Sequence, residues 1–256
     1  MDVPPPSGPQ NDDFTAVSIG AAHRREDWSA NGRLEARFGD REDTWGAYFG
    51  YLHDSYEDTA HSLRLEFFSS EAKGGVDEIQ SLASASLAHR TDPFHWIVLE
   101  RLDFAFDEVA SPGSRLRTAK LINHLKMNQQ WDQRTQVSWA HSARYVVDGF
   151  DGADYDAWSQ LAGIEVRKDF EDYWDMELHA RVRHTAGGAN EFLTSAGLSI
   201  GRVVFENVWV SVGYNFEGFE DSDLANGEYT AQGPFVRLRA KVDQQSVKEA
   251  LEWFSR

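Results

Sequence analysis

The groups in this chain with the clearest chemical potential are histidines that stand close to carboxylates. His179 follows Asp175 and Glu177 at intervals of two residues, and a β-strand would place all three side chains on one face. Imidazole and carboxylate groups at this spacing can exchange protons or bind a metal ion. We interpret them as a hydrogen-bonded cluster inside the protein and predict no metal site there.

A second group, His53-Asp54-Ser55, places a histidine two residues before a serine at the end of a candidate strand. Outer-membrane phospholipases use a histidine and a serine at this spacing, but the surrounding motif of those enzymes is absent here. We interpret the pair as a strand-end histidine and a turn serine. The acidic run Asp221–Asp223 offers oxygen ligands of the kind that calcium prefers, and we interpret it as a solvated loop.

Common catalytic motifs are absent from the sequence. It has no phosphate-binding glycine loop, no HExxH zinc motif and no GxSxG nucleophile motif. It also has no cysteine, which excludes thiolate nucleophiles, disulfides and cysteine zinc sites. We therefore predict that the protein is not an enzyme, with no catalytic residue, no metal and no cofactor.

Charge and aromatic content exclude several classes of protein. The chain has 42 acidic and 25 basic residues, for a formal charge of −17, whereas nucleic-acid binders need a basic face. No apolar run approaches the roughly 18 to 20 residues of a membrane helix. With 16 Phe, 9 Trp and 8 Tyr, the chain is too aromatic for intrinsic disorder.

The elements that must position the candidate groups are β-strands, because polar and apolar residues alternate from end to end. In residues 174–184, Trp174, Met176 and Leu178 occupy one face, and charged residues occupy the other. Most of these segments exceed the usual strand length and suit the roughly 9 to 11 residues that cross a bilayer. We predict strands near 14–23, 32–39, 44–53, 61–69, 79–89, 95–106, 115–128, 133–147, 155–168, 173–185, 191–204, 207–217 and 229–242.

Charged residues are sorted by strand face. Arginine and lysine gather on the polar faces of the predicted strands, whereas most acids fall in turns and loops, so we predict a net positive interior and acidic rims. The residues predicted to face this interior are Arg33, Arg37, Arg64, Arg101, Lys120, Lys126, Arg134, Arg144, Arg167, Asp175, Glu177, His179, Arg181, Arg183, Arg237, Arg239 and Lys241.

Aromatic residues cluster near strand ends, as the girdles at membrane–water interfaces do. Connections alternate between short turns, as at 130–133, 169–173 and 205–207, and longer acidic loops at 148–156, 185–190 and 217–228. The aromatic residues that we assign to the interfaces are Trp45, Trp96, Trp139, Trp174, Trp209, Tyr214 and Phe216.

Together these patterns predict an all-β protein, a closed antiparallel outer-membrane β-barrel of about 12 to 14 strands over residues 13–243. Residues 1–12 read as a flexible Pro-rich lead-in without a signal peptide. Residues 244–256 place Val247, Leu251 and Phe254 at near-helical spacing, which favours a short amphipathic helix. Glu100 interrupts an apolar strand face and indicates a bulge or a shifted register.

Two C-terminal segments, Asn207–Phe219 and Glu228–Gln244, resemble the C-terminal barrel domains of large Gram-negative surface proteins. Weaker similarity lies in Glu26–Arg37, Trp96–Phe104 and Arg134–Val146. Those proteins often carry DUF11-type or Ig-like repeats upstream. The resemblance implies an outer-membrane barrel that anchors or assists a surface-exposed region, and it carries no catalytic residues. Unlike many such barrels, this chain does not end in an aromatic residue on its last strand.

Three functions remain open from the sequence. The first is a membrane anchor or translocator-type domain of a larger cell-surface protein in the bacterial outer membrane. The second is a stand-alone porin-like channel with a basic lumen, and the third is a soluble β-barrel or sandwich that serves as a binding module. The expected partners are outer-membrane lipids and lipopolysaccharide, the barrel-assembly machinery and upstream surface domains of the same polypeptide, but no nucleic acid.

Overall fold

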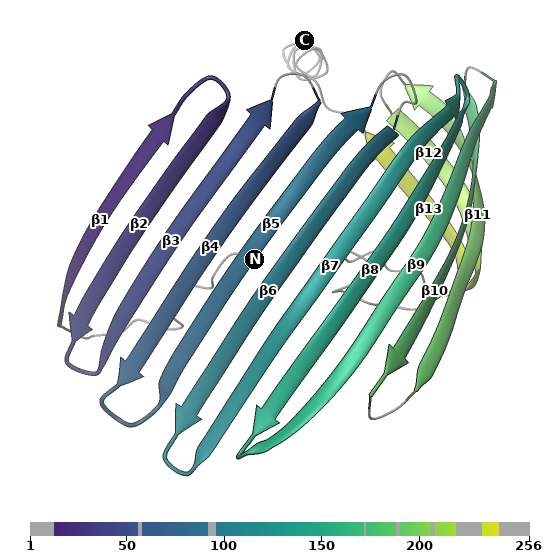
Figure 1. The fold of residues 1–256 in the computed structure, drawn as a ribbon. Helices are drawn as coiled ribbons and strands as arrows, with labels where there is room; N and C mark the ends of the chain where they lie inside the picture. Colours follow the sequence, from purple (N-terminus) through teal and green to yellow (C-terminus); the bar gives the residue numbers. More distant parts are fainter. Residues whose placement is uncertain are drawn as a thin grey trace, which may run out of the picture. The chain divides into compact units, whose positions relative to one another are not determined.

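The computed structural model describes residues 13–55, 58–91, 96–171, 173–187, 190–205, 208–218 and 232–240. They form 13 strands in one sheet, in which each strand pairs with the next along the chain (Figure 1). The predicted lead-in at 1–12, the tail at 244–256, Lys241 and Asp221–Asp223 lie outside the described residues. Among the residues that the structure describes, no helix has the length and apolar character needed to cross a membrane.

Each predicted strand segment corresponds to an observed strand, and most observed strands are longer. They range from 8 residues in β13 to 19 in β7 and β9. The bounds are β1 Phe14–Arg24, β2 Trp28–Gly39, β3 Glu42–Ser55, β4 Thr59–Ala72, β5 Asp77–Thr91, β6 Trp96–Ser111, β7 Ser114–Asp132, β8 Thr135–Phe150, β9 Ala153–Glu171, β10 Trp174–Ala186, β11 Glu191–Phe205, β12 Val208–Glu217 and β13 Gly233–Ala240.

The order of hydrogen-bonded strands runs from β1 to β13. The pairing of β1 with β13 that barrel closure requires does not occur among the described residues. The count of 13 lies within the predicted range but is odd, whereas single-chain bacterial barrels have an even number of strands.

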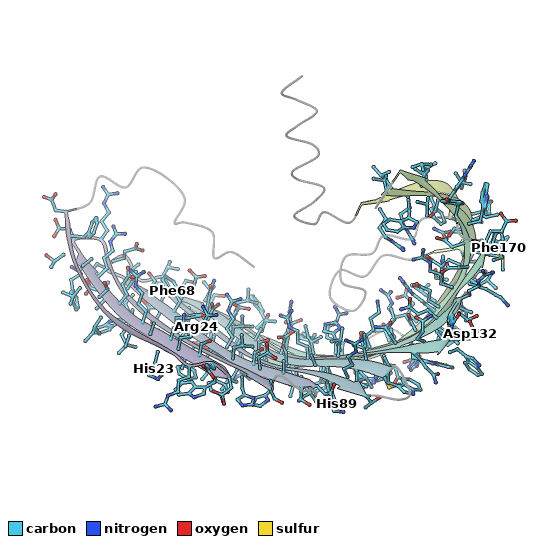
Figure 2. All side chains as sticks on the ribbon, turned by 90° about the horizontal axis from the view of Figure 1, so that it is seen from above. His23, Arg24, Phe68, His89, Asp132 and Phe170 are labelled. Carbon is cyan, nitrogen blue, oxygen red and sulfur yellow. The ribbon has the colours of Figure 1, made fainter. Side chains whose placement is uncertain are left out.

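The chain divides into two compact units. The first comprises the described residues within 1–86, 102–121 and 146–156, and the second comprises those within 87–101, 122–145 and 157–256. In the first unit, β1 to β4 form continuous antiparallel ladders, with Arg33 opposite both Gly20 and Tyr48. Figure 2 shows Phe68 and Arg24 on one face of these strands and His23 on the other, as the alternation of a strand requires.

In the second unit, β9 to β13 are joined by antiparallel ladders with local irregularities. The register of β10 against β9 shifts between Trp174 and Asp175, and that of β11 against β12 shifts near Ala196 and again near Phe205. Between these points the alternation is regular, so residues directly opposite each other share a face.

The predicted acidic loop at 148–156 is wrong, because β8 continues to Phe150 and β9 begins at Ala153. Only Asp151 and Gly152 connect the two strands, with φ angles of 47° and 88°. Two successive positive φ values are typical of the hairpin turn whose twist matches the flanking strands, and Asp-Gly is a preferred sequence for it. The acids at 148–156 therefore lie mostly on strands rather than in a loop.

The irregularity predicted at Glu100 is visible in the exposure of β6. Leu99 and Leu102 are both exposed although they stand three residues apart, so the alternation shifts by one residue between them. Within the second unit, the carboxylate of Glu100 accepts a hydrogen bond from the side-chain amide of Asn123 at 3.2 Å.

Candidate functional site on the polar face of the sheet

The two faces of β10 differ in both chemistry and exposure. Asp175, Glu177 and His179 are buried, with Glu177 only 4% exposed, whereas Met176 and Leu178 are exposed, Leu178 to 46%. We call these the polar face and the apolar face of the second unit. Water-soluble proteins show the opposite arrangement, because they bury apolar side chains. The inverted pattern is the one that a sheet with lipid against its apolar face requires.

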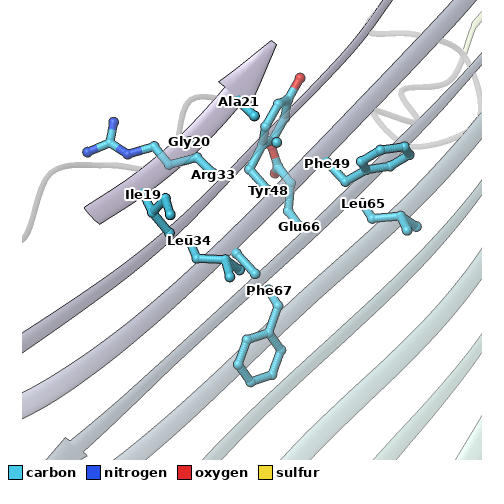
Figure 3. Close-up of a pocket in the computed structure, with 12 residues that line it drawn as sticks. Ile19, Gly20, Ala21, Arg33, Leu34, Tyr48, Phe49, Leu65, Glu66 and Phe67 are labelled. Carbon is cyan, nitrogen blue, oxygen red and sulfur yellow. The ribbon is translucent and has the colours of Figure 1, made fainter. Parts of the chain in front are cut away.

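The first unit has the same two-sided character. Leu34, Leu65 and Phe67 are exposed on its apolar face, and the register places Arg33, Tyr48 and Glu66 side by side on its polar face. The apolar face carries an open groove of about 530 Å³ around Ile19, Leu34, Phe49, Leu65 and Phe67 (Figure 3). A surface of this kind exposed to water would favour association with another apolar surface or with lipid.

Glu177 is the centre of an ionic cluster on the polar face of the second unit. Nη1 of Arg237 donates to both carboxylate oxygens of Glu177, at 2.9 and 3.1 Å. Nη2 of Arg239 lies 3.8 Å and Nδ1 of His179 4.0 Å from the same carboxylate. The buried charge of Glu177 is therefore compensated by two arginines, which is the condition under which a buried carboxylate stays ionised.

A second ion pair lies beside it on the same face. Nη2 of Arg167 donates to Oδ2 of Asp175 at 2.5 Å, and Nε of Arg167 lies 3.8 Å from Oδ1 of Asp169. The sequence thus correctly grouped Asp175, Glu177 and His179 on one strand face. It did not predict which arginines they meet, because Arg237 is distant in the chain.

Small residues on β11 make the contact between β10 and β13 possible. Ser195, Gly197, Ser199 and Gly201 face Arg181, His179, Glu177 and Asp175, respectively. A Cβ added at Gly197 would lie 2.6 Å from the His179 ring and 2.5 Å from Oδ1 of Asn215. Longer side chains therefore lean over this strand from both sides, and Arg237 on β13 reaches Glu177 on β10 across β11 and β12.

The other residues predicted to face the interior pair mostly with side chains on their own strand or on the neighbouring strand. Ion pairs join Arg33 to Glu35 at 2.6 Å, Arg64 to Glu66 at 2.5 Å and Arg183 to Glu191 at 2.6 Å. The guanidinium of Arg37 lies 3.9 Å from the centre of the Phe14 ring. Four more of the predicted arginines also interact with other groups: Arg101, Arg134, Arg144 and Arg181. The two lysines of the set, Lys120 and Lys126, lie on β7.

Sequence reasoning missed several acids that share this face. Glu42 accepts a hydrogen bond from Ser70 at 3.3 Å, and Glu78 accepts one from Gln80 at 2.7 Å. Glu191 pairs with Arg183. All three stand at strand starts that the sequence pattern placed in turns or at the border of a loop. Longer predicted strands would have recovered Glu42 and Glu78, whereas Glu191 already begins a predicted strand but is not assigned to the polar face there. The three acids bring the polar face closer to charge balance than the sequence suggested.

The predicted interface aromatics divide between exposed and half-buried positions. Trp45, Trp139, Tyr214 and Phe216 are exposed, while Trp96, Trp174 and Trp209 are half-buried. Trp45 packs edge-on against Phe38, and Tyr214 packs against Phe216, both at 5.5 Å between ring centres. Trp209 differs from the expectation, because it lies opposite Arg239 in the same alternation as Ser211 and Asn215 on the polar face.

The group His53-Asp54-Ser55 lies at the end of β3. The ring of His53 stacks on His61 at 4.7 Å, and its Nε2 lies 3.9 Å from Asp27. His53 therefore contacts the aromatic ring of His61 on the apolar face, and Tyr51 packs on His61 in turn. Across the described part of the chain, no cluster of three or more His, Cys, Asp or Glu is arranged to hold a metal ion.

Comparison with known proteins supports the fold rather than a particular activity. No protein-family model matches the chain, and no curated protein sequence matches it significantly. Among solved structures, the siderophore receptor PirA from Pseudomonas aeruginosa matches with a TM-score of 0.57 at 9% identity, over 80% of this chain and 39% of the receptor. The copper transporter OprC matches with a TM-score of 0.56 at 11% identity, over 80% of this chain and 44% of the transporter.

The siderophore receptor PirA from Acinetobacter baumannii gives a TM-score of 0.54 at 9% identity, over 82% of this chain and 41% of that one. The chain thus spans about two fifths of the length of these proteins. They are outer-membrane β-barrels, and this chain has the same all-β, antiparallel fold class.

Proposed function

We propose that this chain is an outer-membrane domain that anchors a larger cell-surface polypeptide. The observation that carries the proposal is the inverted exposure of the sheet, with Leu65 and Leu178 exposed while Glu177 is buried in an ion pair. In water such an arrangement loses the free energy of apolar burial, whereas in a bilayer the exposed side chains contact lipid tails.

An anchoring role is favoured over conduction by the packing of β9 to β13. Ser159, Ser195 and Ser199 on the polar face are each only 1% exposed, and the ion pairs of Glu177 and Asp175 lie over the small residues of β11. A water-filled passage would leave these hydroxyl groups exposed. Here these hydroxyl groups are buried instead, which supports a packed polar core of the kind found in narrow barrels.

The test is to refold the full chain into vesicles of phosphatidylethanolamine and phosphatidylglycerol. We expect a form whose electrophoretic mobility changes on boiling and whose strands resist added protease. An epitope placed before residue 13 of the chain, expressed with an export signal in a Gram-negative cell, should reach an antibody on the outer-membrane fraction. Folding in water without detergent into a monodisperse monomer would contradict the proposal.

A porin-like channel is the second candidate, and a groove on the polar face of the first unit favours it. The groove has a volume of about 660 Å³, and the matched proteins are named as receptors and a transporter. Planar-bilayer recording separates the two candidates. An anchor gives no conductance steps, whereas a channel gives them, and a reversal potential under a salt gradient then reports whether anions are preferred.

Membrane partners follow from the anchoring role. The apolar face would contact outer-membrane lipids and lipopolysaccharide, insertion would use the barrel-assembly machinery, and upstream surface domains would be the anchored cargo. Depletion of the assembly machinery in an expressing cell should leave the chain unfolded and protease-sensitive, and normal insertion after depletion would contradict that part of the proposal.

A further inference from the structure

The polar face of the first unit holds a groove that the anchoring role does not use. Its volume is about 660 Å³, and its lining comes from β2, β3, β4, β5 and β6. The side chains that define it chemically are Arg33, Glu35, Tyr48, Glu66, Phe68 and Asp107. A groove of this size falls within the range of small-molecule sites, which combine an apolar surface with a few polar groups.

Tyr48 provides an open aromatic surface in this groove. It stands between Gly46 and Gly50 on the same face of β3, so no side chain of its own strand covers it. A Cβ added at Gly50 would lie 2.6 Å from the Tyr48 hydroxyl oxygen and 2.6 Å from Oδ1 of Asn31. The ring therefore lies along the strand over Gly50, and Tyr48 remains 37% exposed.

Ion-paired side chains flank this ring on both neighbouring strands. Arg33 lies opposite Tyr48 on β2, and Glu66 lies opposite it on β4 (Figure 3). Arg33 is held by Glu35 at 2.6 Å, and Glu66 accepts from Nε and Nη2 of Arg64 at 2.8 and 2.5 Å. The pairing with Arg64 orients Glu66, the less exposed of the two acids, and reduces the side-chain entropy that ligand binding would cost there.

The balance of charge narrows the class of ligand. Among the lining side chains there is one cation, Arg33, against three carboxylates, Glu35, Glu66 and Asp107, so an anion would meet net repulsion. A purely apolar ligand would remove these ionised groups from water without replacing their hydrogen bonds. The ligand must therefore combine a flat, weakly apolar face with an edge that both donates and accepts hydrogen bonds.

We propose that this groove binds a neutral saccharide. One face of a pyranose ring presents C–H groups that pack on an aromatic surface, here Tyr48, with Phe68 diagonally opposite on β4. Hydroxyl groups at the edge of this ring would accept from Arg33 and donate to Glu66, and those of a neighbouring sugar ring would donate to Asp107 on β6. The proposal does not depend on whether the barrel conducts, because binding is measured at the groove itself.

The experiment is a calorimetric titration of the full chain in detergent micelles with maltotriose, cellotriose and triacetylchitotriose. At least one trisaccharide should bind. Tyr48→Ala should weaken that binding about tenfold or more, while Tyr48→Phe, which keeps the ring, should retain it within a few-fold. Tyr214→Ala removes an exposed aromatic residue of the apolar face and should leave binding unchanged. The heat-modified mobility of each variant checks that it is folded.

Several results would overturn the proposal. They are binding of none of the three sugars, equal binding by the wild type and Tyr48→Ala, or binding of tetramethylammonium in place of the sugars, which would identify a cation site. If Tyr48→Ala does not fold, Phe68→Leu and Glu66→Gln replace it, and both should weaken trisaccharide binding several-fold. Full retention of affinity in both of these variants would also contradict a saccharide site.

Discussion

Arg237 and Arg33 make ion pairs with similar N–O distances, but only the carboxylate that pairs with Arg237 is buried. Comparing the two shows how burial of an ion pair changes its contribution to stability. The partner of Arg237 is Glu177, whose side chain is 5% exposed, whereas Arg33 and Glu35 are exposed to 61% and 47%. Arg237→Met removes two hydrogen bonds from a buried carboxylate but leaves Arg239 nearby. We expect a loss of about 1.5–3 kcal/mol in the free energy of unfolding.

Arg33→Met serves as the matched control, because an exposed ion pair contributes only about 0–1 kcal/mol. Urea titration of both variants in micelles, followed by tryptophan fluorescence, gives the two values. Equal losses of unfolding free energy in the two variants would mean that Glu177 is solvated. That result would contradict the proposal of a packed polar core.

Asp132 ends β7 at the turn into β8, beyond the roughly 9 to 11 residues that cross a bilayer. Its carboxylate accepts from the backbone N–H of Arg134 at 2.7 Å and from the Thr135 hydroxyl at 2.9 Å. These hydrogen bonds, that of Arg134 first, lower the pKa of Asp132 from its ordinary value. The ionised group therefore stabilises the turn above its unfolded pKa, and this stabilisation is lost as pH falls through the folded pKa.

For Asp132→Asn we expect a smaller difference in unfolding free energy between pH 7 and about pH 3, because the variant has no carboxylate to protonate there. Urea titrations at the two pH values measure this difference. A variant whose stability changes with pH as much as that of the wild type would show that Asp132 is not a source of the acid sensitivity.

At the scale of elements, substitutions on β11 test whether its small residues are needed to make room for the side chains of β10 and β12. Gly197→Leu would place a side chain where the His179 ring and the Asn215 amide lie, so we expect overpacking that costs about 1–3 kcal/mol. Ala196→Leu changes the adjacent residue, which points to the apolar face with Leu198, and should be tolerated. Heat-modified mobility and urea titration compare the two variants, and equal stability would contradict the packing of side chains over β11.

The positions of the strands and the faces of their side chains could be predicted, because the alternation of polar and apolar residues is a local signal in the sequence. Residues 174–184 show it most clearly, and β10 indeed buries Glu177 and exposes Leu178. Strand ends were less predictable, since acids near 148–156 resemble loop residues while the Asp151–Gly152 turn alone reverses the chain. The pairing of Arg237 with Glu177 depends on the register of three ladders together, which no local pattern contains.

At the scale of the whole molecule, the absence of cysteine allows each introduced thiol to be the only one. Single cysteines at Leu63, Leu65 and Phe67 lie on the apolar face, and those at Arg64, Glu66 and Phe68 lie on the polar face. In vesicles, a lipid-soluble quencher should reach labels on the first set and spare the second. Uniform quenching along β4 would contradict the assignment of lipid to the apolar face.

The strand count has a consequence for sidedness. The described residues form an odd number of consecutive antiparallel strands. If each strand crosses the membrane, as the anchoring proposal requires, Phe14 at the start of β1 and Ala240 at the end of β13 belong to opposite sides. A barrel with an even count returns both ends to the same compartment. A reporter joined at residue 13 and another joined at residue 240 would therefore sample different compartments, one facing the periplasm and the other facing the cell exterior.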